Sequence, residues 1–424
     1  MNQLPAGWTW STLGEISDVV GGVTKNSKHQ NRPDLVEVPY LRVANVQRGR
    51  IDLSNVTSIR VSAPKAVQLA LQPGDVLLNE GGDRDKLGRG WVWQGQIPGC
   101  IHQNHVFRAR IRNGLLHPKL LAWYANEVAH GWFELNGRQS VNLASISLSK
   151  IRTFPVPIPP VAEQQRIVDI LEDHFSRLDA AMASLATAKT RVRALERSAL
   201  DLHFGSDSDG VPLDELVADI SAGKSFGSSN APAEPGEWGI IKVSAMTWGE
   251  FRPEENKAVS AERVDLRFEI RPGDLLVSRA NTSEYVGASV LVESVRPKLL
   301  LSDKSLRLTP RRGVRVEWLW RALQAPSARR QISALATGTK DSMRNISQAS
   351  LRRVLLPKSD LDEQVKAMAG FIQIKSAIDR MRTELAFQER RSAALRRSIL
   401  AAAFSGQLSG RNSDFARVAD LASA

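Results

Sequence analysis

The chain has 424 residues, enough for two or more hydrophobic cores, and its formal net charge of +12 favours an anionic partner. Its single cysteine, Cys100, excludes disulfides within the chain and a zinc site built from several cysteines, and we expect it in the core. No apolar run approaches the roughly 18 residues of a membrane span and the first ten residues do not resemble a signal peptide, so we expect a soluble, cytoplasmic protein with no membrane partner.

Residues 1–159 are predicted to form a mainly β domain with 18 basic and 11 acidic residues. The alternating, β-branched run 40–46 is typical of a strand. Pro73 and Gly74 predict a turn that leads into a buried strand at 76–78. A short helix is expected near 118–130, followed by a polar loop at Gly137.

Residues 160–205 are predicted to form one long amphipathic helix. Its apolar side chains recur at the alternating spacing of three and four residues that is typical of a coiled-coil seam. Proline precedes this helix and glycine follows it, as expected for helix boundaries. The helix would be about 65 Å long at 1.5 Å per residue, so it requires a partner of similar length. The seam residues are Leu171, Leu178, Leu185, Val192 and Leu195.

The second half of the chain repeats the first with a shift of about 200 residues. After a linker at 206–210, residues 211–359 carry 23 basic and 17 acidic residues and repeat the Pro-Gly-Asp turn at 272–274. A second long helix at 360–406 repeats Glu163-Gln164 as Glu363-Gln364, and a tail at 407–424 follows it. Gln388 and Ser392 interrupt its seam, so we expect its two ends to pack most tightly. This seam comprises Phe371, Ile378, Leu385, Leu395 and Ile399.

No catalytic motif is convincing. The run 222–225 ends like a phosphate-binding loop, but Ala218 stands where its first glycine belongs. The run 33–39 begins like a metal-dependent nuclease strand but has Pro39 in place of a lysine. His102 and His105 lie three apart in a strand-like run and are expected to be surface or groove residues, not metal ligands. The sequence therefore predicts no catalytic residue, metal or cofactor in this chain.

The sequence resembles the specificity (HsdS) subunits of Type I restriction-modification systems. The resemblance rests on Phe154–Pro160, followed by Glu163-Gln164 and Ile167-Val168 at the start of a long helix, repeated after a Pro-Gly-Asp strand domain. It implies two target recognition domains that each read one half of a bipartite, asymmetric target in double-stranded DNA. It also implies that the long helices set the gap and dock two methyltransferase subunits, which hold S-adenosylmethionine; whether restriction subunits complete the assembly stays open.

The expected fold class is α+β, with two mainly-β target recognition domains joined by two long helices that pair as an antiparallel coiled coil, in a pseudo-twofold internal repeat. Basic residues would bind phosphates, and side chains that fit base edges would give selectivity. Two alternatives are a non-catalytic coiled-coil adaptor whose basic domains bind acidic partners, and an enzyme whose site has no recognised motif. The candidate DNA contacts lie mostly in predicted loops, among them 79–89, 102–105, 138–142, 279–284 and 340–345. They are Lys25, Lys28, Arg42, Asn45, Arg48, Asn79, Arg84, Lys86, Arg89, His102, Gln103, Asn104, Arg138, Gln139, Asn142, Lys224, Lys242, Arg279, Asn281, Thr282, Lys304, Lys340, Arg344 and Asn345.

Overall fold

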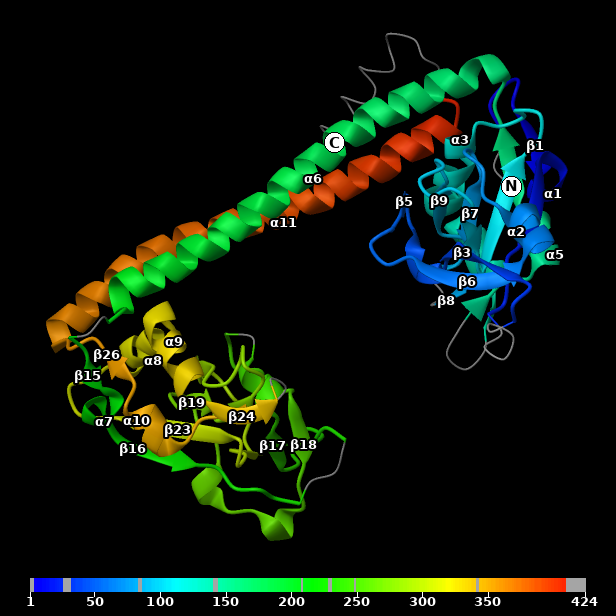
Figure 1. The fold of residues 1–424 in the computed structure, drawn as a ribbon. Helices are drawn as coiled ribbons and strands as arrows, with labels where there is room; N and C mark the ends of the chain where they lie inside the picture. The colour runs from blue at the N-terminus through cyan, green and yellow to red at the C-terminus, as the bar shows by residue number, and fades with distance from the viewer. Residues whose placement is uncertain are drawn as a thin grey trace. The chain divides into compact units, whose positions relative to one another are not determined.

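The chain folds into two α+β units, seen in Figure 1. The computed structural model describes residues 4–25, 32–82, 86–139, 144–206, 209–227, 231–247, 249–340 and 343–408. Unit 1 contains Met1–Leu185 and Phe387–Ala424, and unit 2 contains Ala186–Ala386. The two long helices, α6 (Val161–Phe204) and α11 (Leu361–Phe404), each contribute one half to each unit. The boundaries between the units therefore fall within α6 and α11.

Unit 1 is built on a four-stranded antiparallel sheet in the order β2 (Ser17–Gly21), β11 (Val106–Ile111), β7 (Val76–Asn79) and β9 (Gly90–Val92). Strand β7 is buried on both faces, which explains its continuous apolar run. Val76 and Leu78 pack into the main core, whereas Leu77 packs on the opposite face. The main core also contains Leu171 of α6 and Ile399 of α11, so the half-helices of unit 1 are part of its hydrophobic core.

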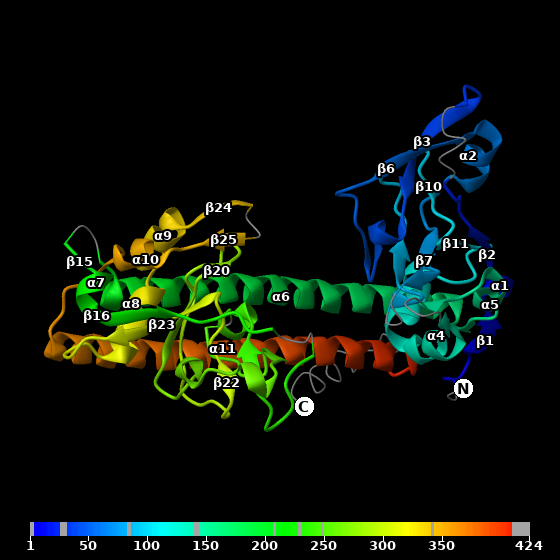
Figure 2. The ribbon, with the colours of Figure 1, turned by 90° about the horizontal axis from the view of Figure 1, so that it is seen from below.

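Smaller sheets and short helices complete unit 1. In Figure 2 the sheet of β10, β3 and β6 and helix α2 lie at the end of the unit away from the long helices. The remaining elements, in chain order, are β1 (Thr9–Thr12), α1 (Leu13–Ile16), β3 (Leu35–Leu41), η2 (Val43–Asn45), β4 (Val46–Gln47), β5 (Arg50–Ile51), β6 (Thr57–Ser62), α2 (Ala63–Leu69), β8 (Gly81–Gly82), β10 (Ile101–His102), α3 (Pro118–Trp123), the π-helical turn η4 (Tyr124–Val128), α4 (His130–Asn136), β12 (Arg138–Gln139), β13 (Ala144–Ser145), α5 (Leu148–Arg152) and β14 (Pro155–Ile158).

Unit 2 repeats the strand order of unit 1. Its main sheet runs β16 (Val217–Ala222), β23 (Ser305–Pro310), β19 (Leu275–Ser278) and β21 (Ser289–Leu291). The remaining elements are β15 (Val211–Pro212), α7 (Leu213–Leu216), β17 (Gly239–Ile241), η5 (Val243–Met246), β18 (Asn256–Ala258), η6 (Ala261–Arg263), η7 (Leu266–Phe268), β20 (Ala280–Asn281), β22 (Leu299–Leu300), α8 (Val316–Gln324), α9 (Pro326–Leu335), β24 (Thr337–Lys340), β25 (Met343–Asn345), α10 (Gln348–Arg352) and β26 (Leu355–Leu356).

The repeated Pro-Gly-Asp turn leads into the central strand of each main sheet. Gly74 and Gly273 have φ angles of 94° and 89°, a left-handed conformation that glycine adopts without the strain of a side chain. In unit 1 the buried Asp75 carboxylate accepts from the backbone N–H of Gln72 at 2.7 Å and pairs with the Arg110 guanidinium at 2.7 Å. The motif thus closes the turn and ties it to β11.

The repeated Glu-Gln step fixes the start of each long helix. Gln164 is 4% exposed, accepts from the His117 backbone N–H at 2.7 Å, and donates to the carbonyl oxygens of Leu115 and Pro159, both at 3.0 Å. Gln364 makes the same three bonds in unit 2, at 2.9 to Arg315, 3.2 to Gly313 and 3.0 Å to Ser359. In each unit, one amide side chain therefore joins the start of the long helix to the loop that follows β11 or β23.

Two further features bear on the sequence predictions. Cys100 is fully buried, as predicted, and burial raises the pKa of its thiol to about 12. Across the described ranges, no helix combines the length and apolar character that a membrane span requires.

Candidate nucleic-acid interface

A small three-stranded sheet in unit 1 brings two predicted loops together. Strand β8, within the predicted loop 79–89, pairs with β13, and β13 pairs with β12, which begins at Arg138. Glu80, immediately before β8, anchors this sheet to the main sheet. Its N–H donates to the His105 carbonyl oxygen at 3.0 Å, and its own carbonyl oxygen accepts from the Ile146 N–H at 2.9 Å. Residues far apart in sequence thus converge at this edge of the unit.

Unit 2 contains the same arrangement. Strand β20 pairs with β25, and β25 pairs with β24. Arg279 occupies the place of Glu80: its N–H donates to the Lys304 carbonyl oxygen at 2.8 Å, and its carbonyl oxygen accepts from the Ile346 N–H at 2.9 Å. The guanidinium of Arg344 in β25 donates to the Gly338 carbonyl oxygen at 3.1 Å and so closes the β24–β25 hairpin. We call these two sheets, β12-β13-β8 and β24-β25-β20, the recognition sheets.

The candidate contacts differ in exposure. Asn281 lies on a recognition sheet, and its carboxamide oxygen accepts from the Thr282 N–H at 2.9 Å. Lys242 pairs with Glu255 at 3.8 Å, and Arg48 pairs with Glu127 at 3.8 Å. The exposed candidates are Lys25, Arg48, Arg138, Lys224, Thr282, Lys304 and Asn345. The half-buried ones are Arg42, Lys86, Arg89, Gln103, Asn104, Lys242, Arg279, Asn281 and Arg344.

Three predicted contacts are buried and stabilise the fold instead. Asn45 is 3% exposed, accepts from the Arg42 N–H at 2.8 Å and donates to the Asp52 carbonyl oxygen at 2.9 Å. Asn79 is fully buried and donates to the Val46 carbonyl oxygen at 2.9 Å. His102 is also fully buried, so the expectation that it is a surface or groove residue is wrong. These three side chains have almost no exposed surface from which to contact DNA.

The buried histidine is held neutral. His102 Nδ1 lies 2.7 Å from the Val106 carbonyl oxygen, and burial is the main cause that lowers the pKa of the ring to about 4. His105, by contrast, is exposed, and its Nδ1 lies 3.0 Å from Glu80 Oε2. Glu80 and His105 lie in the candidate loops 79–89 and 102–105 but were not singled out, although their alignment with Arg279 and Lys304 could have identified them.

Five candidates cannot be placed in full. Lys28, Arg84 and Asn142 lie outside the described residues. For Gln139 and Lys340 the structure describes only the backbone, as members of β12 and β24.

In unit 1, four of the predicted seam residues of the long helices lie in the main core or pack against it. Leu171 and Ile399 are fully buried in the main core, and Leu178 and Leu395 pack against it. The same helix faces carry a polar pair, because Arg396 of α11 donates to Asp179 of α6 at 2.9 Å. The guanidinium of Arg396 also lies 4.2 Å from the ring centroid of Phe175, a cation–π contact.

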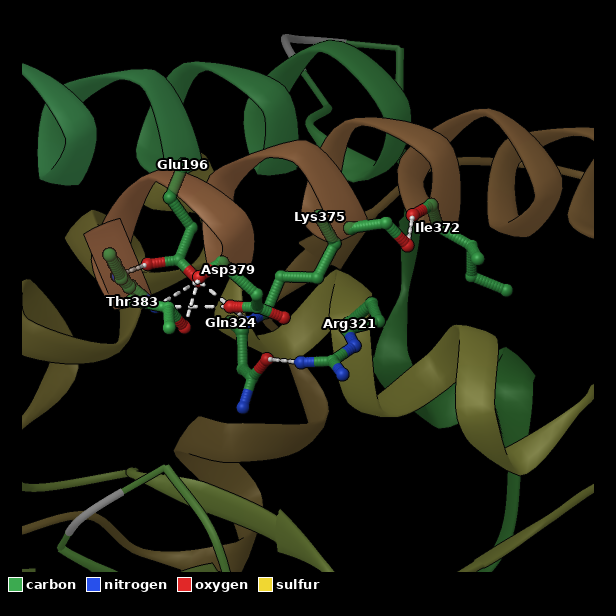
Figure 3. A network of polar contacts seen from close by, with 9 residues as sticks. Glu196, Arg321, Gln324, Ile372, Lys375, Asp379 and Thr383 are labelled. Carbon is green, nitrogen blue, oxygen red and sulfur yellow. Dashed lines mark hydrogen bonds and ion pairs between the residues drawn. The ribbon is translucent and has the colours of Figure 1, made fainter.

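The corresponding faces in unit 2 are joined by a charged network, shown in Figure 3. Glu196 of α6 pairs with Arg382 and, at 3.8 Å, with Lys375 of α11. Lys375 also pairs with Asp379 on its own helix. Alternating charges on two helices thus compensate one another at a partly buried contact.

Arg321 of α8 lies beside this network. Its guanidinium donates to Gln324 Oε1 at 2.8 Å and stacks 3.7 Å from the ring centroid of Trp320. Burial lowers the pKa of Arg321, while Glu196 is the first of several carboxylates that act in the opposite direction. The guanidinium also lies 5.3 Å from the ring centroid of Phe371 and thus links α8 to α11.

The predicted seam position Leu195 is wrong. Leu195 is 44% exposed, whereas Glu196 faces α11 and forms the ion pairs. The apolar neighbours of Glu196 along α6, Val192 and Ala199, are buried. The contact face of α6 therefore continues from Val192 by four residues to Glu196 and by three more to Ala199. Leu195 precedes Glu196 by one residue, so its side chain is rotated about 100° around the helix from that of Glu196. Of the other seam residues, Phe371 and Ile378 are buried, and Leu185 and Leu385 are half-buried.

No group of three or more histidine, cysteine, aspartate or glutamate side chains in the part of the chain that the structure describes is arranged to hold a metal ion. The polar side chains on the recognition sheets, among them Arg138, Asn281 and Arg344, are hydrogen-bond donors and acceptors. Their arrangement is suited to recognising a polar surface.

The sequence of the chain is similar to those of known proteins. Residues 5–183 match the family described as Type I restriction modification DNA specificity domain. The Escherichia coli EcoKI specificity subunit is 22% identical over 96% of this chain and 91% of its own length. The EcoEI specificity subunit, also from Escherichia coli, is 29% identical, and the match spans 41% of this chain but only 30% of that protein.

Two solved structures share the fold. One, described as the structural basis of complex assembly and conformational transition of the type I R-M system, has a TM-score of 0.74 at 21% identity and covers 96% of this chain and 100% of that one. The HsdS subunit from Thermoanaerobacter tengcongensis has a TM-score of 0.51 at 20% identity, with coverage of 96% and 98%.

Proposed function

Since this chain belongs to the HsdS family of DNA specificity subunits of Type I restriction-modification systems, a family of non-catalytic recognition proteins, we propose that it reads a bipartite target. Each strand-rich domain binds one half of an asymmetric DNA sequence, and the long helices set the unread gap between the halves. The helices also dock two methyltransferase subunits, and it is these partners that hold S-adenosylmethionine.

The observation that carries this proposal is the duplicated recognition sheet. Each unit holds a three-stranded sheet at the end of the central strand of its main sheet, fixed by the same two backbone hydrogen bonds. The side chains at these equivalent backbone positions differ between the units, as two readers of different sequences require. Both domains carry an excess of basic residues, 18 against 11 in residues 1–159 and 23 against 17 in residues 211–359, which favours binding to phosphates.

The antiparallel coiled coil with pseudo-twofold symmetry is supported by equivalent contacts in the two units. Position 396 of α11 contacts position 179 of α6 in unit 1, and position 196 of α6 contacts Lys375 and Arg382, which flank position 379, in unit 2. A shift of 200 residues converts one contact region into the other. Such a relation is expected when two copies of one helix pair in opposite directions.

The proposal is tested by exchanging residues 1–155 for the matching domain of a relative with a different target. The hybrid and the natural chain are each expressed with the methyltransferase subunits, and the modified sites are read by methylome sequencing. We expect one half-sequence to change while the other half and the gap are retained. An adaptor that binds acidic proteins would direct no sequence-selective methylation, and a hybrid that alters both halves would contradict the division into two readers.

A further inference from the structure

The residues that immediately precede β8 and β20, the equivalent strands of the two recognition sheets, carry opposite charges. Glu80 and Arg279 each follow the central strand of a main sheet and make the same pair of backbone hydrogen bonds. Their neighbours across the sheet, His105 and Lys304, are also equivalent, because each provides the carbonyl oxygen for one of those bonds. The backbone therefore presents both side chains from the same place, and only the chemistry of the side chain differs.

The two sites offer complementary hydrogen-bonding groups. Glu80 is an acceptor whose Oε2 is occupied by His105 Nδ1 at 3.0 Å, while Oε1 has no hydrogen-bond partner among the described residues. The Glu80 side chain is 23% exposed and that of His105 is 55% exposed, so the pair is accessible from the surface. Arg279 is half-buried and Lys304 exposed, and within the described ranges neither side chain has a polar partner.

These groups match different base edges in the major groove. A carboxylate accepts hydrogen bonds, and the groups that donate there are the N4 amino group of cytosine and the N6 amino group of adenine. A guanidinium or ammonium only donates, and guanine alone presents two acceptors, O6 and N7, side by side.

We propose, on the basis of the function proposed above, that the position of Glu80 and Arg279 determines the base accepted at one place in each half-sequence. Glu80, oriented by His105, selects a base that presents an amino group, adenine or cytosine. Arg279, with Lys304 beside it, selects guanine. The duplicated scaffold thus reads different sequences by exchanging an acceptor for a donor at a fixed backbone position.

The test uses the full chain assembled with its methyltransferase subunits, and the readout is methylation of duplexes in which each target base is randomised in turn. For Glu80→Arg we expect one position of the first half-sequence to change from adenine or cytosine to guanine, with a change in relative preference of about tenfold or more. For Arg279→Glu we expect the loss of a guanine from the second half-sequence. All other positions and the gap should be unchanged.

Matched substitutions control for charge. Glu134 forms a comparable half-buried pair with His130, at 3.4 Å, so Glu134→Arg makes the same change of charge in the same unit on α4, outside the strands of the recognition sheet. Arg312→Glu is the control for unit 2, because Arg312 is exposed and lies in the turn after β23. Both controls should retain the natural sequence preference. If Glu80→Arg fails to assemble, Glu80→Gln carries the test and should relax the preference at the same single position.

Three results would contradict the inference. The first is a natural half-sequence for unit 2 that contains no guanine. The second is that the two substituted chains keep the natural preference. The third is a uniform loss of methylation that grows with salt, which would assign these side chains to phosphate contacts. A natural chain that directs methylation to no specific sequence would instead contradict the proposed function itself, so the two failures are distinguishable.

Discussion

At the scale of single residues, each of the two repeated glutamines, Gln164 and Gln364, makes three hydrogen bonds to the backbone. Gln164 satisfies one backbone donor and two backbone acceptors at the start of α6. A buried donor or acceptor that loses its partner costs about 1–3 kcal/mol. The Glu-Gln step that marks the sequence repeat is therefore explained by hydrogen bonding within the fold.

We expect Gln164→Glu to lower the free energy of unfolding by at least about 1–3 kcal/mol, because the carboxylate cannot donate to Leu115 and Pro159 and places a charge in a buried site. Chemical denaturation of the purified chain measures this change. The control is Gln165→Glu, since Gln165 is the exposed next residue, and it should have little effect. Equal stabilities for the two substituted chains would contradict the role assigned to Gln164.

The buried His102 gives a pH dependence of known sign. Its pKa is about 4 in the folded chain and about 6.5 when exposed, so between these values the unfolded chain binds a proton that the folded chain does not. His102 therefore makes its full contribution above pH 6.5, and that contribution is lost as the pH falls toward 4. Between pH 7 and pH 5 we expect the loss to be about 2 kcal/mol. Denaturation at both pH values should show a smaller difference for His102→Gln, and an unchanged difference would refute this assignment.

At the scale of elements, the long helices show what periodicity predicts and what it does not. The spacing of apolar residues predicts the helices and the buried positions Leu171, Phe371, Ile378 and Ile399. It places Leu195 on the seam because leucine fits the apolar pattern, but the ion pairs of Glu196 with α11 turn that face toward the partner. A pattern restricted to apolar residues cannot detect a contact made by a charge and its distant counter-charges.

Leucine-to-alanine substitutions should distinguish buried positions of the long helices from exposed ones. We expect Leu171→Ala to cost about 2–5 kcal/mol, because Leu171 is fully buried in the main core. Leu195→Ala should change the free energy of unfolding by only about 0.5 kcal/mol, because its side chain is exposed. Thermal or chemical unfolding of the two variants measures these costs. A larger cost at Leu195 than expected would show that Leu195 belongs to the seam after all.

For the polar residues of the recognition sheets, too, the sequence predicts the segments involved but not every contact. The sequence predicts the loops that form them, since their positions repeat with a shift of about 200 residues. It does not predict that Asn79 turns inward, because its partner is the carbonyl oxygen of Val46, 33 residues earlier in the chain. Nor does it predict the pairing of Glu80 with His105, which depends on the register between β7 and β11.

At the scale of the whole molecule, the proposed ruler makes a quantitative prediction. Insertion of one heptad after Ala188 and one after Gln388 lengthens each helix by about 10 Å and keeps its apolar spacing in phase. This length corresponds to about three base pairs. We expect both half-sequences to persist while the unread gap grows, and the rotation of DNA over that distance to lower affinity.

Methylome sequencing of cells that carry the lengthened chain and its methyltransferase measures the gap directly. The control is a chain with conservative exchanges at exposed positions of the same helices, which should keep the natural gap. Sites with the original gap in the lengthened chain would show that the helices do not set the distance.

The division of each long helix between two units also has a consequence for the order in which the chain folds. Unit 2 is a continuous segment, Ala186–Ala386, whereas unit 1 needs residues from both ends of the described chain. Its main core includes Ile399, Leu400, Ala403, Phe404 and Leu408, which a ribosome makes more than 200 residues after Leu171. Although domains usually fold in the order of their synthesis, unit 2 can complete its core first. The domain that is translated first is then the last to be finished, and its exposed apolar surface must be protected until the end of α11 has been made.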